Sequence, residues 1–252
     1  NFDTDPIQVI VDNGWIKVKG TTLGADNGIG MALMLAVLSS DNLKHPALEC
    51  LFTTDEETGL TGAFALDNNL LKGEILINLD SEDDGEIFVG CAGGIDTTAT
   101  LKVKTKDTPR HFFAFSVTVK GLMGGHSGDD IDKRRGNANK MLNRILWNMH
   151  KDLDLHLVKI DGGNLRNAIP REASAVACVP FVHKEKVRVI FNEVAAELED
   201  ENAAIETNMR IELHSEEIPD RVMTRRSTSK ILNALYACPH GIKAMSPDMA
   251  GL

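Results

Sequence analysis

Acidic residues gather at three places in this chain, and each place lies where a predicted buried strand ends. The three clusters are Asp26, the pair Glu56 and Glu57, and Asp80. In open α/β sheets, ligands bind in the crevice beyond the carboxyl ends of the strands. A bridging carboxylate, a glutamate base beside a glutamate ligand, and one more aspartate suit a site that holds two divalent metal ions. The clusters therefore predict a metal site at one edge of a sheet.

The first part of the chain alternates predicted strands with predicted helices. Short apolar or alternating runs indicate strands at residues 15–19, 47–53 and 75–79, and apolar stretches indicate helices at 29–40 and 60–66. Such an alternation is typical of βαβ units and a mainly parallel sheet. The three acidic clusters would then face the same edge of that sheet.

The pattern changes beyond residues 106–110, a polar segment that is a linker candidate. The expected order there is strand, helix, strand, strand, helix, strand, which is the ferredoxin-like arrangement. The expected strands are 113–120, 155–160, 173–182 and 209–213, the expected helices are 137–150 and 184–199, and a further helix is expected at 220–236. The predicted fold class is therefore α/β with a mainly parallel sheet in a partial domain at residues 1–107, followed by a ferredoxin-like α+β domain at residues 108–252.

The charge of the chain limits its partners. The 252 residues carry a net charge of −10, and the isoelectric point lies near 5.3. Nucleic acids and anionic membranes are not expected partners, since the chain has no basic stripe that could release counterions. No apolar run approaches the length of a membrane span.

The cysteines indicate the cell compartment of the protein, and the first residue indicates the extent of the chain. Cys50, Cys91, Cys178 and Cys238 are widely spaced and form no Cys-x-x-Cys pair, so we expect reduced core thiols in a cytoplasmic protein. The sequence begins with Asn1 rather than methionine. We expect it to be a piece of a longer protein.

Seven segments carry a resemblance to a known family. The chain resembles the dinuclear zinc peptidases related to carnosinase, along nearly its whole length and most weakly at residues 184–226. The segments are Leu23–Gly30, Thr54–Gly59, Asn78–Glu82, Gly90–Asp96, Lys120–Gly128, Gly136–Lys140 and Leu165–Glu172.

The resemblance implies a role for each acidic residue. Asp26 would bridge two Zn²⁺ ions, with a cis peptide bond after it, while Glu57 would bind one zinc and Asp80 the other. Glu56 would be the general base that activates water and then the acid that protonates the leaving amine. The implied reaction is the hydrolysis of dipeptides by metal-activated water. A preference for Xaa-His comes from the resemblance alone.

The resemblance also implies roles for the ferredoxin-like part, which would be the lid and dimerisation domain of a cytoplasmic homodimer. His126 would reach a neighbouring active site and stabilise the oxyanion. Asn167 would contact the carboxylate end of the short peptide substrate.

Each of these residues also has a plain structural explanation. Asp26, or the asparagine after it, could cap a helix. Glu56 and Glu57 could form an acidic turn, and Asp80 could begin a solvated acidic loop with residues 82–84. His126 could be an ordinary loop residue, and Asn167 a turn residue before a strand.

Other functions stay open. A related tripeptidase or an N-acyl amino-acid deacylase could use the same metal core, and a dimerisation or binding module could keep the scaffold without metal. Nucleotide binding is disfavoured, because Gly24-x-x-x-Gly28-x-Gly30 is not the dinucleotide fingerprint and the chain has no Gly-Lys-Ser/Thr phosphate loop.

The family pattern further includes two histidine ligands. A His-x-Asp motif would precede Asn1, and a second ligand histidine would follow Leu252. Each zinc would then keep two protein ligands instead of the usual three of a catalytic site. We expect these 252 residues by themselves to bind metal weakly and to lack peptidase activity.

Overall fold

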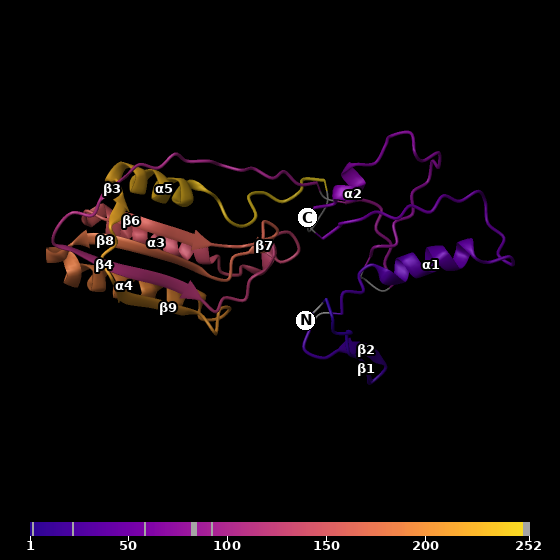
Figure 1. Ribbon diagram of the computed structural model, residues 1–252, viewed down its shortest axis with the longest axis horizontal. Coiled ribbons are helices and arrows are strands. Elements are labelled where there is room, and N and C mark those ends of the chain that lie inside the picture. Colours follow the sequence, from indigo (N-terminus) through magenta and orange to yellow (C-terminus); the bar gives the residue numbers. More distant parts are fainter. Residues whose placement is uncertain (2, 22, 58, 82–84, 92, 249–252) are drawn as a thin grey trace. The chain divides into compact units, whose positions relative to one another are not determined.

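The computed structural model describes residues 1, 3–21, 23–57, 59–81, 85–91 and 93–248. They form two compact units, which we call the N-terminal unit (Asn1–Asp96) and the C-terminal unit (Thr97–Leu252) (Figure 1). Strand β3 (Thr105–Asp107) pairs inside the C-terminal unit. The units thus divide ahead of residue 107, and a domain boundary at that residue stays a prediction.

The C-terminal unit is built on a four-stranded antiparallel sheet in the order β6-β8-β4-β9. Chain order runs β4, α3, β6, β8, α4, β9, so the predicted ferredoxin-like arrangement is confirmed. The bounds are β4 (Phe112–Lys120), α3 (Ala138–Asp152), β6 (His156–Gly162), β8 (Ala173–Pro180), α4 (Lys184–Asn202) and β9 (Arg210–Glu216).

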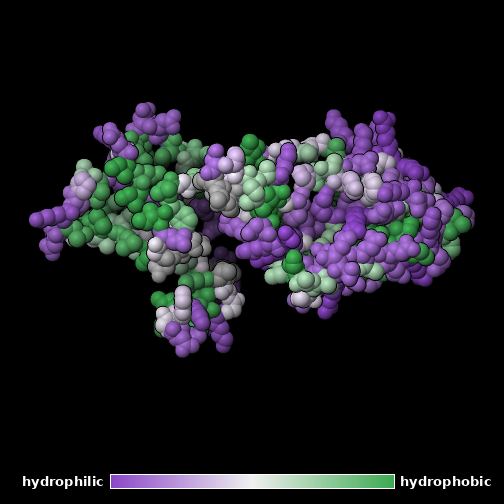
Figure 2. Space-filling view, turned by 180° about the vertical axis from the view of Figure 1, so that it is seen from behind, coloured by the Kyte–Doolittle hydropathy of each residue, from purple (hydrophilic) through white to green (hydrophobic). Residues whose placement is uncertain are grey.

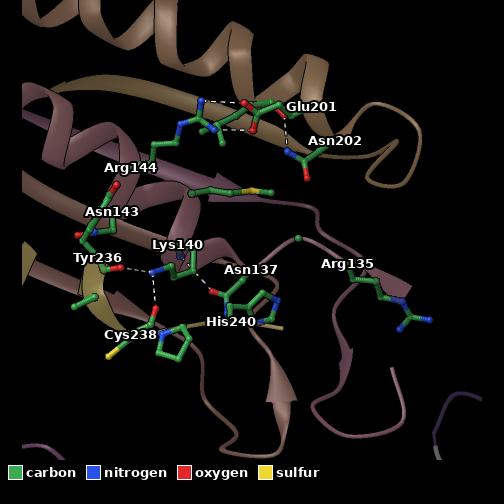
Figure 3. Close-up of a pocket in the computed structure, with 15 residues that line it drawn as sticks. Arg135, Asn137, Lys140, Asn143, Arg144, Glu201, Asn202, Tyr236, Cys238 and His240 are labelled. Carbon is green, nitrogen blue, oxygen red and sulfur yellow. Dashed lines mark hydrogen bonds and ion pairs between the residues drawn. The ribbon is translucent and has the colours of Figure 1, made fainter. Parts of the chain in front are cut away.

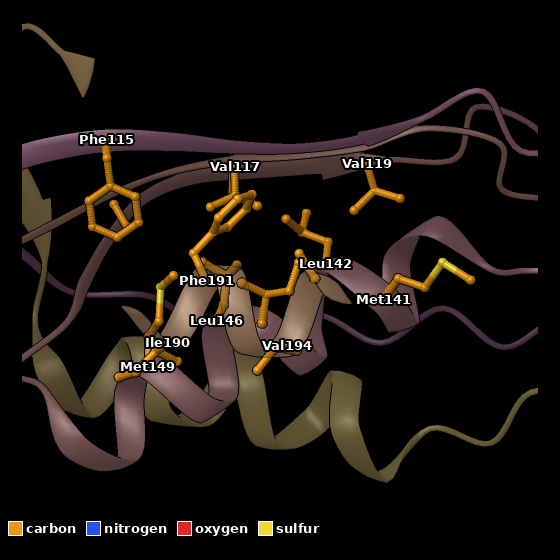
Figure 4. Packing of buried hydrophobic residues seen from close by; sticks show 14 of the residues in the cluster. Phe115, Val117, Val119, Met141, Leu142, Leu146, Met149, Ile190, Phe191 and Val194 are labelled. Atoms are coloured by element: carbon orange, nitrogen blue, oxygen red, sulfur yellow. The ribbon is translucent and has the colours of Figure 1, made fainter. Parts of the chain in front are cut away.

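Strand β4 shows why the sheet has one helix-covered face. Its side chains alternate, and Phe115, Val117 and Val119 are fully buried toward α3 and α4 (Figure 4). Because side chains of a strand point to opposite faces in turn, three apolar residues at every second position line a single face. Phe112 and Ala114 alternate with them and join a smaller buried cluster with Cys178.

Both helices bury a stripe of side chains three and four residues apart. The stripe of α3 is Ala138, Met141, Leu142, Ile145, Leu146 and Met149, and that of α4 is Val187, Ile190, Phe191, Val194, Ala195 and Leu198. This spacing puts every member of a stripe on one face of a 3.6-residue helix. The Asn137 side chain caps α3 by accepting the Lys140 N–H at 3.2 Å.

The last predicted helix begins later than expected. Residues Arg221–Met223 form β10, which pairs with β3, and helix α5 spans Arg225–Ala237. The Thr224 hydroxyl accepts the Ser227 N–H and starts the helix there. The expected linker is wrong in part, because its residues 106 and 107 belong to β3.

Short elements complete the unit. Strand β5 (Gly125–His126) pairs antiparallel with β7 (Ala168–Ile169), and two 3₁₀ turns span Ile131–Lys133 and Phe181–His183. No described helix is both long and apolar enough to cross a membrane.

The N-terminal unit contains a β-hairpin and two helices. Strands β1 (Val9–Asp12) and β2 (Trp15–Val18) pair antiparallel. Asn13 and Gly14 connect them with positive φ angles of 51° and 83°, as the Asn-Gly turn of a two-residue hairpin requires. The helices are α1 (Gly28–Leu38) and α2 (Thr61–Phe64).

The predicted parallel sheet does not form among the described residues of this unit. Residues 47–53 and 75–79, expected as strands, have no strand partner there. A strand exists only through hydrogen bonds to a neighbour, and the apolar side chains of Ile75, Leu76 and Ile77 are 86%, 82% and 74% exposed. Figure 2 shows such hydrophobic side chains gathered on the surface of the N-terminal unit, whereas the visible face of the C-terminal unit is mostly hydrophilic.

The expectation of four core thiols is correct only for Cys178. Cys178 is buried, Cys50 is half-buried, and Cys91 and Cys238 are exposed. All four are free thiols, and burial raises the pKa of the Cys178 thiol to about 11. The apolar residues beside each cysteine in the sequence therefore do not predict whether its thiol is buried.

Candidate functional site

The three acidic clusters come together in the N-terminal unit. The carboxyl groups of Asp26 and Asp80 share a hydrogen bond, and the charges of both aspartates raise the pKa of Glu56 together with the charge of Glu57. The structure thus places all four predicted acidic residues in one group. We call it the acidic group.

Asn27 fixes the position of Asp26. Its side-chain oxygen accepts the Gly30 N–H at 3.0 Å and so caps α1, while its Nδ2 donates to the Leu79 carbonyl at 3.1 Å. One side chain therefore joins the loop of Asp26 to the segment that carries Asp80. The Asp26–Asn27 peptide bond is cis, as the family resemblance implies. The cap is Asn27, so the Asp26 carboxylate is not used for capping.

A tight turn holds Glu56 and Glu57. The Glu56 carbonyl accepts the N–H groups of Gly59 and Leu60, both at 3.1 Å, and the Gly62 N–H donates to the Thr54 carbonyl at 3.1 Å. A Cβ at Gly62 would lie 2.6 Å from the backbone of Thr54, so only glycine allows α2 this close. The predicted glutamate pair is thus anchored by the start of a helix.

Crowding shifts two carboxyl groups of the acidic group. Partial removal from water, then the charges of Glu57, Asp80 and Asp26, raise the pKa of Glu56. Partial burial, then the charge and the hydrogen bond of Asp26, raise the pKa of Asp80. A hydrogen bond between two carboxyl groups requires one shared proton, because two carboxylates both only accept.

The chemistry of this donor set fits divalent cations. Clustered carboxylate oxygens are hard ligands, and a cation would replace the shared proton and favour the charged forms. The described residues contain no group of three or more His, Cys, Asp or Glu side chains arranged to hold a metal ion. The ligand roles of Asp26, Glu57 and Asp80 therefore stay predictions.

We expect Asp26→Asn to lower the pKa of Asp80 and of Glu56. The Asp26 charge raises the pKa of both groups, and its hydrogen bond raises that of Asp80 further. The substitution removes the charge and the proton-sharing partner, so both pKa values should fall. Side-chain carboxyl carbon shifts followed by NMR against pH give both pKa values. Asp41→Asn, at an exposed position, is the control. An unchanged or higher pKa of Asp80 in Asp26→Asn would contradict this grouping.

The C-terminal unit brings the two other predicted site residues together. His126 on β5 lies opposite Ala168 on β7, and the Ser127 N–H donates to the Asn167 carbonyl at 2.8 Å. The His126 side chain is about half exposed, and Asn167 is an exposed turn residue directly before β7. Both side chains therefore border the same strand pair.

Glu206 is a buried residue of this region that the sequence did not single out. It is 3% exposed, and its two carboxylate oxygens accept the N–H groups of Met123 and Gly136, each at 2.7 Å. It thereby ties both ends of the segment 121–136, which we call the His126 loop. A glutamate so far along the chain from the histidine carries no sequence signal for such a role, because its partners are backbone groups.

The described part of the C-terminal unit contains at least two cavities. One of about 520 Å³ borders the β5–β7 pair and is lined by polar, small and apolar residues that include Ser127, Asn139, Leu165 and Ala168. Concave sites of this size suit small ligands. Ser127 and Ala168, the sequence neighbours of His126 and Asn167, line this cavity, which makes it the better candidate for substrate.

The other cavity has a volume of about 570 Å³, and two of the basic side chains that line it bind other groups of the protein. Its Lys140 ammonium donates to the carbonyls of Leu235, Tyr236 and Cys238 at 2.7, 2.9 and 2.6 Å, which satisfies the end of α5 (Figure 3). Its Arg144 pairs with Glu201 at 2.6 Å. These two side chains therefore serve the packing of the helices rather than a ligand.

Comparisons with known proteins identify relatives of this chain. A family model described as "Peptidase dimerisation domain" matches residues 117–206. The cytosol non-specific dipeptidase of Escherichia coli (strain K12) is 46% identical over 242 residues, which are 96% of this chain and 50% of that protein. The crystal structure of an aminoacylhistidine dipeptidase from Vibrio alginolyticus matches with a TM-score of 0.76 and 46% identity, over 100% of this chain and 51% of that one.

The chain spans about half the length of these relatives. The match extends through both units, including the acidic group and the His126 loop. The structural match covers the whole chain, and the dimerisation-domain model lies within the ferredoxin-like unit. The chain therefore belongs to the family of peptidases that carry this dimerisation domain.

Proposed function

We propose that the whole protein that contains this chain is a zinc-dependent dipeptidase of the cytoplasm. The observation that carries the proposal is the 46% identity to a dipeptidase along 96% of the chain. That relative is named as an enzyme of the cytosol. The structural relative from Vibrio alginolyticus is an aminoacylhistidine dipeptidase, and we propose Xaa-His dipeptides as substrates.

The acidic group would hold two zinc ions. Asp26 would bridge them, Glu57 would bind one and Asp80 the other. When bound, the ions supply a Lewis acid that polarises the peptide carbonyl and makes water easier to deprotonate. Glu56 would stay unligated and face the water.

Glu56 then moves the proton. A charged, unligated carboxylate beside the attacking water can accept a proton from it and later donate that proton. It would remove a proton from the attacking water and give it to the amine that leaves. The water oxygen forms a bond to the peptide carbon, and the C–N bond breaks.

His126 and Asn167 would act on the other parts of the substrate. The imidazole would donate a hydrogen bond to the carbonyl oxygen as negative charge develops on it. The Asn167 amide would contact the terminal carboxylate of the dipeptide. Support comes from their common position beside the β5–β7 pair and the cavity of about 520 Å³.

We also propose a homodimer formed through the C-terminal unit, in which His126 serves the partner's acidic group. The support is the dimerisation-domain match at residues 117–206. The proposed partners are a short peptide and a second copy of the protein, without nucleic acid or membrane.

The first test measures zinc content and hydrolysis on the whole protein. We expect two zinc ions per subunit and cleavage of Xaa-His dipeptides, with loss of both after chelation and return on adding zinc. A panel with tripeptides, N-acyl amino acids and dipeptides lacking histidine separates the related activities. The 252-residue chain, measured in parallel, tests the expectation of weak metal binding without activity. A whole protein without zinc and without hydrolysis would leave only a binding module.

A further inference from the structure

The His126 loop is held from within by Asp130. Its Oδ2 accepts the His126 backbone N–H at 2.8 Å and lies 3.1 Å from Nη1 of Arg135, while its Oδ1 accepts Nζ of Lys133 at 2.5 Å. These contacts, the Lys133 hydrogen bond first, lower the pKa of Asp130. The carboxylate is thus charged, and it is directed at the backbone of the histidine.

Arg135 binds the backbone on the other side of Gly125. Its Nη1 donates to the Gly124 carbonyl at 2.7 Å, so Asp130 and Arg135 grip the peptide groups before and after Gly125. Gly125 has φ of 144°, and a Cβ there would collide with both side chains of the ion pair. Only glycine admits this close approach.

The imidazole of His126 is oriented by two backbone donors. Its Nδ1 accepts the N–H groups of Gly128 and Asp129, each at 3.2 Å. A neutral imidazole accepts through its unprotonated nitrogen, so the proton lies on Nε2. A proton on Nδ1 would face both N–H groups, although the exposed Asp129 carboxylate lies 3.5 Å away. The ring therefore presents Nε2–H as a donor.

We propose that Asp130 is a positioning residue that fixes His126 as the Nε2–H tautomer through the backbone of the loop. An oxygen that gains negative charge needs a donor already in place, and a ring free to exchange tautomers would offer one only part of the time. The use of this donor in peptide hydrolysis rests on the proposed function. The tautomer itself does not.

The tautomer is measured without any reaction. In the 252-residue chain labelled with ¹⁵N-histidine, long-range ¹H–¹⁵N correlations above the titration range show which ring nitrogen carries the proton. We expect His126 to show the Nε2–H pattern alone. The exposed ring of His111, which has no hydrogen bond within the described residues, is the internal reference for a mixture.

Asp130→Ala should move His126 toward the His111 pattern, with the Nδ1–H form rising several-fold. Asp132→Ala, an exposed carboxylate of the same loop, should change nothing. Unchanged amide signals of β4 and β8 show that the unit stays folded, and Asp130→Asn is the milder substitute if they do not. A mixture in the parent chain, or an unaltered His126 pattern in a folded Asp130 variant, would overturn the proposal.

Kinetics on the whole protein separate this proposal from the proposed function. We expect Asp130→Ala to lower kcat about 10-fold or more with KM little changed, and to add little to His126→Ala, because residues that act as one unit are not additive. If His126→Ala leaves kcat intact, the proposed role of the histidine fails while the tautomer assignment stands. If only His126→Ala lowers kcat, the positioning role of Asp130 fails.

Discussion

Glu56→Gln in the whole protein is expected to lower kcat for dipeptide hydrolysis by about 10²–10⁴-fold, the usual contribution of a general base. Glutamine keeps the size of the side chain and removes the proton acceptor. Because the volume of the side chain is unchanged, the substitution should not displace zinc by a steric clash, and the acidic group then carries one negative charge fewer. Metal analysis beside steady-state kinetics distinguishes a lost base from a lost metal ion.

The matched control is Glu74→Gln, an exposed carboxylate of the same unit. It should keep full activity. A Glu56→Gln enzyme with nearly full kcat would remove Glu56 from the mechanism. An inactive enzyme that has also lost its zinc would make Glu56 a ligand instead.

The same variant tests whether His126 acts across a dimer. Mixing Glu56→Gln with His126→Ala subunits should restore about a quarter of the parent activity, because half of randomly formed dimers are mixed and one of their two symmetric sites is then intact. Recovery must follow subunit exchange and be absent when the two proteins are kept as separate dimers. No recovery after proven exchange would place His126 in its own subunit's site.

The second large effect concerns the core of the C-terminal unit. We expect Phe115→Ala to reduce the free energy of unfolding of this unit by about 3–5 kcal/mol, through lost burial and the cavity that remains. Phe115 is fully buried on β4, where its ring faces α3 and α4 (Figure 4). A loss of this size is a large fraction of the stability of a typical domain.

Urea unfolding followed by circular dichroism of the 252-residue chain measures this loss. Phe181→Ala removes the same ring from a position that is 57% exposed, and it should change the stability by no more than about 0.5 kcal/mol. If the alanine variant does not fold, Phe115→Leu gives a smaller loss on the same scale. Equal losses at positions 115 and 181 would contradict a core centred on β4.

The C-terminal unit could be predicted because its pattern is local. In β4 the alternation around Phe115 and Val117 indicates a strand, and in α3 the spacing of Leu142 and Leu146 indicates a helix. The antiparallel neighbours of β4 lie in the same unit, so each predicted element finds its partner. Strand β10 was missed because three residues carry too little pattern to outweigh the following helix.

The parallel sheet predicted for the N-terminal unit does not form among its described residues, and the sequence pattern could not reveal this. Residues 75–79 have the composition of a buried strand, but composition does not supply the neighbouring strand that a ladder needs. The grouping of the acidic residues was predicted from strand ends that meet at one sheet edge, whereas in the structure loops and the Asn27 hydrogen bonds bring the segments of Asp26 and Asp80 together. Asp130 within the His126 loop and Glu206 outside it were not predicted, because both accept backbone N–H groups, which have no residue-specific signature.

The pairing of β5 with β7 brings His126 and Asn167, which are far apart in the sequence, to the same place in the fold. His126 lies opposite Ala168, and the Ser127 N–H donates to the Asn167 carbonyl, so we expect the two side chains to shift together when either strand moves. Under the roles that we propose, one of them marks the bond to be cut and the other marks the end of the peptide. The separation of the two side chains, set by the strand pair, then selects substrates by the number of atoms between the bond that is cut and the carboxylate end.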